Sequence, residues 1–205
     1  MNQRTDTRSQ LVDTARKLFA RNGFDGCSIR AITDAAGANL GAVTYHFGSK
    51  EALYEAVCAS LVDPLRERIA AVRTEAGAPL DRIERLVRTF FAYLREQPEL
   101  PRMIMQQLAS DRPMPVAVTR TLQSNHGTLS ALIAEGQEGG SIREGDPRLM
   151  ALSIGPQPML LALVRRPLQK AVAIDQDDPE TWQRLVEHAV AFVRAGLTRR
   201  VEDTI

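Results

Sequence analysis

Residues 42–54 read AVTYHFGSKEALY, and this stretch decides how the N-terminal part of the chain folds. Gly48 and Ser49 interrupt a helical pattern in its middle. Glycine commonly ends a helix, and serine is a preferred N-cap residue. The stretch therefore predicts a short helix over residues 41–47, followed at once by a long helix that begins at Lys50.

The apolar residues of the helix at 41–47 define its two sides. Val43 and Phe47 are four positions apart, so both lie on one face, which we expect to be buried. The opposite side is expected to face outward, and it carries Asn39, Leu40, Gly41, Thr44 and Tyr45.

Two further helices are expected before this one. Apolar residues at helical spacing predict a helix of roughly residues 6–21, which Asn22-Gly23 ends. Ser28 is placed as the N-cap of a second short helix, residues 29–36, and Gly37 ends that helix. Two short helices joined by a three-residue turn form a helix-turn-helix.

The remainder of the chain keeps helical periodicity, and no strand is expected. Pro64 lies within the apolar stripe of the helix that starts at Lys50. It either breaks that helix after Val62 or leaves a continuous, kinked helix. Further helices are expected at about 79–97, 98–110, 113–138, 147–165 and 179–198. Asp146 and Pro147 suit the N-cap and first position of the helix at 147–165, and Pro156 and Pro158 are expected to disturb that helix.

The fold class is therefore all-α, with about nine helices. We expect residues 1–48 to form a helix-turn-helix domain and residues 49–205 to form a larger helical domain. A buried core is feasible because 44% of the 205 residues are hydrophobic.

Composition excludes several classes of protein. No apolar run approaches the ~18 residues of a membrane helix, and the first ten residues are polar without a following apolar segment. Cys27 and Cys58 lack the spacing of metal-binding or redox cysteines. We therefore expect a cytoplasmic protein with two free, semi-buried cysteines.

Charge and motifs point to nucleic acid rather than to catalysis. The net charge is +1, but residues 1–50 carry seven Lys and Arg side chains against four Asp. The three histidines, His46, His126 and His188, lack metal-ligand spacing, and the sequence has no nucleophile elbow or phosphate-binding glycine loop. We expect no enzymatic activity, cofactor or metal.

The outward residues around the third helix suit DNA recognition. A short helix fits the major groove, where Thr44 can bond a base or touch a thymine methyl group. Tyr45 can contact a phosphate or a sugar. Lys50 combines an ammonium group with the free N–H groups of a helix start, which suits a phosphate. The Ser28 hydroxyl can bind a phosphate in the same way.

The segments Ser28–Gly37 and Gly41–Leu53 closely resemble the DNA-binding domain of TetR-family bacterial repressors. The likeness spans about residues 7–54, because Leu18–Phe24 also fits the end of that family's first helix. The resemblance favours a phosphate contact for His46, and a structural hydrogen bond is the alternative. Leu40 stands where many relatives carry a polar or basic residue, so only an apolar contact is expected there.

The resemblance implies a homodimeric repressor that a small apolar or amphipathic effector releases from a palindromic DNA operator. The resemblance makes residues 1–48 the DNA-binding domain and residues 49–205 the domain for ligand binding and dimerisation. It places the dimer interface on helices 147–165 and 179–198. Methionine, aromatic and polar side chains can line an effector pocket. The candidates are Phe90, Tyr93, Met103, Gln106, His126, Met159 and Trp182.

Two other functions stay open at this point. One is a DNA-binding regulator that a protein partner controls without a small-molecule effector. The other is a helical protein that sequesters a ligand and whose N-terminal helix-turn-helix is vestigial. Salt dependence and sequence preference in DNA binding separate both from a repressor.

Overall fold

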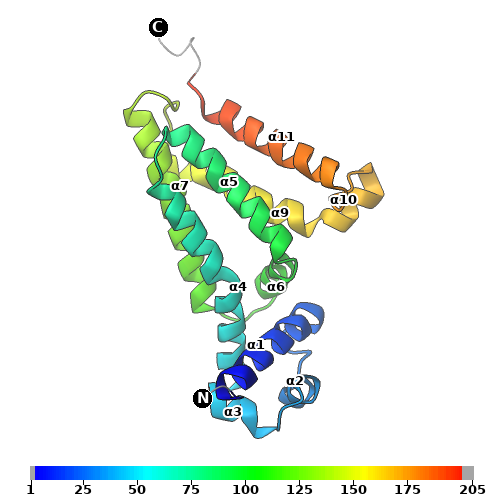
Figure 1. The fold of residues 1–205 in the computed structure, drawn as a ribbon. Helices are drawn as coiled ribbons and strands as arrows, with labels where there is room; N and C mark the ends of the chain where they lie inside the picture. The colour runs from blue at the N-terminus through cyan, green and yellow to red at the C-terminus, as the bar shows by residue number, and fades with distance from the viewer. Residues whose placement is uncertain (1–2, 200–205) are drawn as a thin grey trace. The chain divides into compact units, whose positions relative to one another are not determined.

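A computed structural model describes the backbone of residues 3–199 and the side chains of residues 7–199. This range contains eleven α-helices, and Figure 1 shows how they are arranged along the chain. The all-α class is confirmed, because the only β-type pairing among the described residues is an isolated bridge between Ile142 and Thr198. The helices are α1 (Gln3–Asn22), α2 (Ile29–Ala36), α3 (Gly41–Phe47), α4 (Lys50–Arg73), α5 (Pro79–Glu96), α6 (Glu99–Leu108), α7 (Val116–Glu138), α8 (Pro147–Ile154), α9 (Pro156–Leu163), α10 (Arg165–Val172) and α11 (Pro179–Leu197).

The chain forms two compact units. The first contains residues 1–64 and 99–120, and the second contains residues 65–98 and 121–205. The helices α4 and α7 each contribute residues to both units. The predicted division into residues 1–48 and 49–205 concerns function and stays a prediction. Residues 1–2 of the first predicted domain and residues 200–205 of the second lie outside the described residues.

An aromatic cluster forms the centre of the first unit. Phe19 on α1 stacks with Phe24 at 5.8 Å between ring centroids. Tyr54 on α4 meets both rings edge-on, at 5.0 and 5.1 Å. Tyr54 is only 7% exposed, so burial raises the pKa of its phenol.

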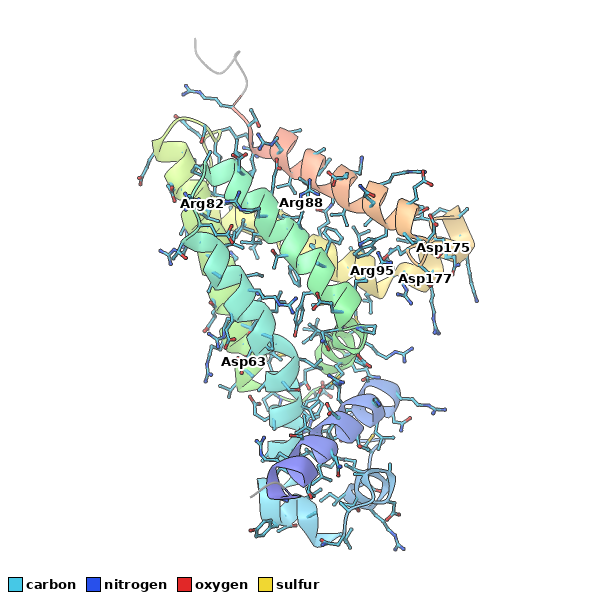
Figure 2. All side chains as sticks on the ribbon, in the orientation of Figure 1. Asp63, Arg82, Arg88, Arg95, Asp175 and Asp177 are labelled. Atoms are coloured by element: carbon cyan, nitrogen blue, oxygen red, sulfur yellow. The ribbon has the colours of Figure 1, made fainter. Side chains whose placement is uncertain are left out.

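In the second unit α5 packs against both α9 and α11 (Figure 1). Arg88 and Arg95, labelled on α5 in Figure 2, each contact α11. Arg88 donates two hydrogen bonds to the carboxylate of Glu187, at 2.5 and 2.7 Å. The guanidinium of Arg95 lies 5.2 Å from the centroid of the Trp182 ring. These contacts join α5 to α11 beside their shared apolar core.

Pro64 does not break α4. The helix runs without interruption from Lys50 to Arg73, with Pro64 inside it. The alternative of a break after Val62 is therefore wrong. Apolar residues on both sides of Pro64, such as Leu61 and Leu65, are buried, so packing keeps the chain helical where a hydrogen bond is missing.

The prediction of a single helix over residues 147–165 was wrong. The structure divides residues 147–172 into α8, α9 and α10, which explains eleven helices in place of about nine. Pro156 and Pro158 lack the N–H groups that would continue the ladder, so α8 ends at Ile154. Asp146 caps α8 as predicted, because its carboxylate accepts a hydrogen bond from the Arg148 N–H at 2.8 Å.

Candidate nucleic-acid interface

The helix-turn-helix is built from local caps that the sequence predicted. The Ser28 Oγ accepts a hydrogen bond from the Ala31 N–H at 3.0 Å and so begins α2. Gly37 adopts the left-handed conformation, with φ of 63°, and ends α2. The chain then turns through residues 38–40 into α3.

One face of α3 holds it in the core of the first unit. Val43 is fully buried, as predicted, and Ala42 is 7% exposed. Phe47 is only half-buried, and the guanidinium of Arg8 lies 5.0 Å from its ring centroid. The inner face therefore includes Ala42, which the sequence interpretation omitted, and it leaves Phe47 at its edge.

The opposite face of α3 and the preceding turn are open to solvent. Leu40 and Tyr45 are large side chains that remain 60% and 65% exposed. Neither side chain is part of the core of the first unit, so both are accessible to a partner. The exposed set comprises Asn39, Leu40, Gly41, Thr44 and Tyr45, and their predicted outward placement is confirmed.

His46 lies between the two faces. It is half-buried, and its ring meets that of Tyr45 edge-on at 4.9 Å. The centroid of the Phe47 ring, which belongs to the next residue, lies 6.3 Å from the centroid of the His46 ring. The phosphate contact of His46 stays a prediction.

The start of α4 follows the expected pattern. The Ser49 Oγ accepts a hydrogen bond from the Ala52 N–H at 3.1 Å, so Ser49 caps the helix. Lys50 is the first residue of α4. Beside it, hydrogen bonds from its own backbone N–H and then from Ser49 lower the pKa of Glu51. The helix thus begins with an ammonium group beside a carboxylate, and the N–H groups of Glu51 and Ala52 already have acceptors.

Two aromatic contacts at this site could not be read from the sequence. The Nζ of Lys50 lies 4.1 Å from the centroid of the Phe24 ring. The Cζ of Arg112, in the segment between α6 and α7, lies 3.5 Å from the same centroid. Arg112 is remote in sequence and carries no motif.

The predicted effector residues lie in both units. Met103 and Gln106 belong to the first unit, and Phe90, Tyr93, His126, Met159 and Trp182 belong to the second. Gln106 borders a cavity of about 150 Å³ that Phe24, Asp25 and Arg112 also line. Met103 borders a different, apolar space of about 10 Å³, too small for an effector.

The effector candidates of the second unit have local partners. Tyr93 is 1% exposed and packs under the guanidinium of Arg68, at 5.0 Å from its ring centroid. The His126 Nε2 lies 3.1 Å from the carbonyl oxygen of Arg148. Trp182 meets Phe91 edge-on at 5.8 Å, whereas Phe90 and Met159 are half-buried. These contacts are compatible with a helical core, and the pocket stays a prediction.

The described part of the chain shows neither a metal-binding cluster nor a membrane-spanning helix. Among the side chains of residues 7–199, no group of three or more His, Cys, Asp or Glu is arranged to hold a metal ion. Among residues 3–199, no helix is both long and apolar enough to cross a bilayer. Cys27 and Cys58 are free, as predicted, but both are fully buried rather than semi-buried.

The fold and the exposed outer face of α3 define a helix-turn-helix protein. Residues 11–57 match the family described as bacterial regulatory proteins, tetR family, and residues 79–193 match the tetracyclin repressor-like C-terminal domain. The chain therefore belongs to the TetR family, and the resemblance of its N-terminal segments is confirmed.

Named relatives and solved structures agree with this family. The chain is 25% identical to the transcriptional regulator RutR of Escherichia coli K12 over 93% of this chain and 90% of RutR. Its fold is similar to that of the ketosteroid transcriptional regulator KstR2 of Mycobacterium tuberculosis, with 23% identity, a TM-score of 0.73 and coverage of 98% and 97%. It is also similar to FadR of Bacillus subtilis in complex with stearoyl-CoA, with 18% identity, a TM-score of 0.75 and coverage of 92% and 98%.

Proposed function

We propose that this regulator is a repressor that binds a palindromic operator as a homodimer. The observation that supports this proposal is the exposed outer face of α3, which presents Thr44 and Tyr45. Lys50 follows at the start of α4. In a dimer, two copies of α3 enter major grooves about 34 Å apart, one turn of the duplex. The protein acts on the chromosome and therefore in the cytoplasm.

Each outer residue has a distinct role in this proposal. Thr44 reads a base edge, and Tyr45 contacts the backbone of the duplex. Lys50, Ser28 and His46 bind phosphates, which contribute affinity without sequence preference. Asn39, Leu40 and Gly41 lie at the entry to α3, where Leu40 makes an apolar contact.

The dimer interface is proposed on α8, α9 and α11. These helices carry large apolar side chains that remain exposed in the single chain, and such surface is typical of an interface. They are Leu149, Leu152, Leu160 and Phe192, each at least 56% exposed.

A small apolar or amphipathic effector is proposed to release the operator. Support comes from the family and from FadR, which was solved with stearoyl-CoA. Coupling between effector and operator of about 1–3 kcal/mol would change operator affinity by about 5–150-fold. The effector site is proposed among the candidate residues of the second unit.

Selection of duplexes from a random-sequence pool by the purified protein tests the DNA-binding part of this proposal. We expect a palindromic motif and a steep loss of affinity with salt. Lys50→Ala should weaken binding to every duplex and lower the salt slope by about 1, whereas Thr44→Ala should relax one base preference. Lys17→Ala, which removes an exposed lysine of α1, is the matched control. Recovery of no common motif would contradict the repressor function.

A further inference from the structure

Two cations share one aromatic ring in the first unit. Lys50 and Arg112 lie 4.1 and 3.5 Å from the centroid of the Phe24 ring. A cation over an aromatic face is attracted by the ring quadrupole, and the attraction is stronger where water is excluded. Phe24 is only 9% exposed, so its ring is a well-supported platform for both cations.

The backbone around Arg112 is held by a buried amide. Gln107 is 4% exposed, and its Nε2 donates hydrogen bonds to the carbonyl oxygens of Arg112 and Pro113, each at 3.1 Å. The Arg112 N–H donates to the Ser110 Oγ at 3.4 Å. Arg112 therefore extends from a segment whose backbone is fixed at that point.

The other end of this segment is tied to α4. The Glu55 carboxylate accepts hydrogen bonds from the Val116 N–H at 3.1 Å and from the Ala117 N–H at 2.8 Å. A carboxylate at these first N–H groups stabilises the start of α7. Glu55 lies five positions after Lys50 on the same helix. The segment between α6 and α7 is thus fastened to the part of α4 that carries Lys50.

The ring contact matters for Lys50 because its side chain is long and flexible. A lysine that is free to rotate loses conformational entropy when it binds a phosphate. An ammonium group already held over a ring loses less. Lys50 can keep the ring on one side and offer its remaining N–H donors to a phosphate on the other.

We propose that Arg112 is a positioning residue for Lys50. It packs on Phe24 and fixes the ring that holds the Lys50 ammonium group, and it does not itself contact DNA. This inference rests on the proposed function, since it requires Lys50 to bind a phosphate. Through the Phe24 ring, the segment between α6 and α7 would influence how Lys50 binds DNA.

A double-mutant cycle tests the proposal on the full chain, with a duplex selected from the random pool as the probe. Arg112→Ala should weaken binding about three- to fivefold without changing the salt slope, because no phosphate contact is lost. In the Lys50→Ala background the same change should have no further effect. Arg112→Lys keeps a cation over the ring and should restore most of the affinity. Arg102→Ala, which removes an exposed arginine of α6, is the control for lost charge.

A second measurement needs no DNA. The Lys50 Hε protons should be shifted by the ring current of Phe24, and Arg112→Ala should move their NMR signals toward the values of an unstructured lysine. An unchanged Lys50 signal would overturn the inference. So would an Arg112→Ala effect that persists without Lys50, or a salt slope reduced by about 1, because either result indicates a direct phosphate contact. If Lys50→Ala leaves affinity unchanged, the phosphate role of Lys50 fails instead, whatever the NMR signals show.

Discussion

At the scale of single residues, the candidate interface combines exposed groups with groups already engaged inside the protein. Thr44 and Tyr45 face solvent, whereas Lys50 lies over Phe24 and the Ser28 hydroxyl caps α2. A hydroxyl that accepts a cap bond keeps its own proton for a phosphate oxygen. Structural and DNA-binding roles are therefore compatible at the same side chain.

The buried Cys58 should be inert in the folded protein. Burial, reinforced by the nearby Glu55 charge, raises the pKa of its thiol to about 12, so the reactive thiolate is absent at neutral pH. We expect negligible labelling of Cys58 by a maleimide at pH 7.5, and complete labelling in guanidinium chloride. Peptide mass spectrometry distinguishes Cys58 from Cys27. Labelling of Cys58 at the rate of a free thiol would contradict the burial.

The same pKa shift predicts how stability depends on pH. The folded-state pKa of Cys58 lies above its ordinary value of 9.0, so the thiol remains protonated in the fold when the unfolded chain ionises. Its contribution to the free energy of unfolding is present below about pH 9. It is lost progressively as the pH rises toward 12.

At the scale of elements, α4 shows how packing decides a local conflict. Pro64 leaves the carbonyl of Ser60 without its usual helical donor, yet α4 continues to Arg73. The division between the two compact units also falls directly after Pro64. A weakened turn thus coincides with the place where α4 passes from one unit to the other.

Replacement of Pro64 by alanine should stabilise α4. Pro64→Ala restores an N–H donor inside the helix, and we expect the free energy of unfolding to rise by on the order of 1 kcal/mol. Pro79→Ala is the matched control, because Pro79 begins α5, where no N–H donor is needed. Denaturant titration monitored by circular dichroism measures both. A fall in stability for Pro64→Ala would show that proline is the better residue there.

Pro64 should also matter more for effector response than for DNA affinity. Its position lets the turn bend, so Pro64→Ala should change the effector concentration needed for operator release more than the affinity for the selected duplex. Fluorescence anisotropy of the duplex reports both quantities once an effector is identified. Comparable changes in the two would count against this role.

At the scale of the whole molecule, the proposed dimer accounts for apolar surface that a single chain leaves exposed. Leu152 on α8 and Phe192 on α11 are 56% and 66% exposed. Aromatic side chains such as Phe192 dominate interface energetics when they are buried, and burial of a leucine removes further apolar surface from water. Their helices belong to the same compact unit, so one surface of that unit can supply the interface.

Charge at this surface should disrupt the dimer. Leu152→Glu or Phe192→Glu would place a carboxylate in an apolar interface, and we expect dimer affinity to fall at least 10-fold. Light scattering after size-exclusion chromatography measures the mass directly. Leu108→Glu, on α6 in the first unit and equally exposed at 62%, should leave the mass unchanged. Persistence of the dimer in both interface variants would place the interface elsewhere.

The local features of this protein follow from its sequence alone. Ser28, Gly37 and Asp146 mark helix ends where the structure has them, because capping and left-handed turns involve residues only a few positions apart. The bounds of α2 and α3 and the outward side of α3 were predictable for the same reason. The division of residues 147–172 into three helices was missed, although Pro156 and Pro158 had signalled a disturbance.

Only the tertiary structure decided the contacts between distant parts of the chain. Arg112 lies on Phe24 together with Lys50, and Glu55 caps the start of α7. No periodicity or motif encodes these pairs, because they depend on how helices pack after they form. Packing also kept α4 continuous through Pro64. The AVTYHFGSKEALY stretch thus specified the outward face of α3 and the start of α4. The surrounding fold determined how Lys50 is held over Phe24.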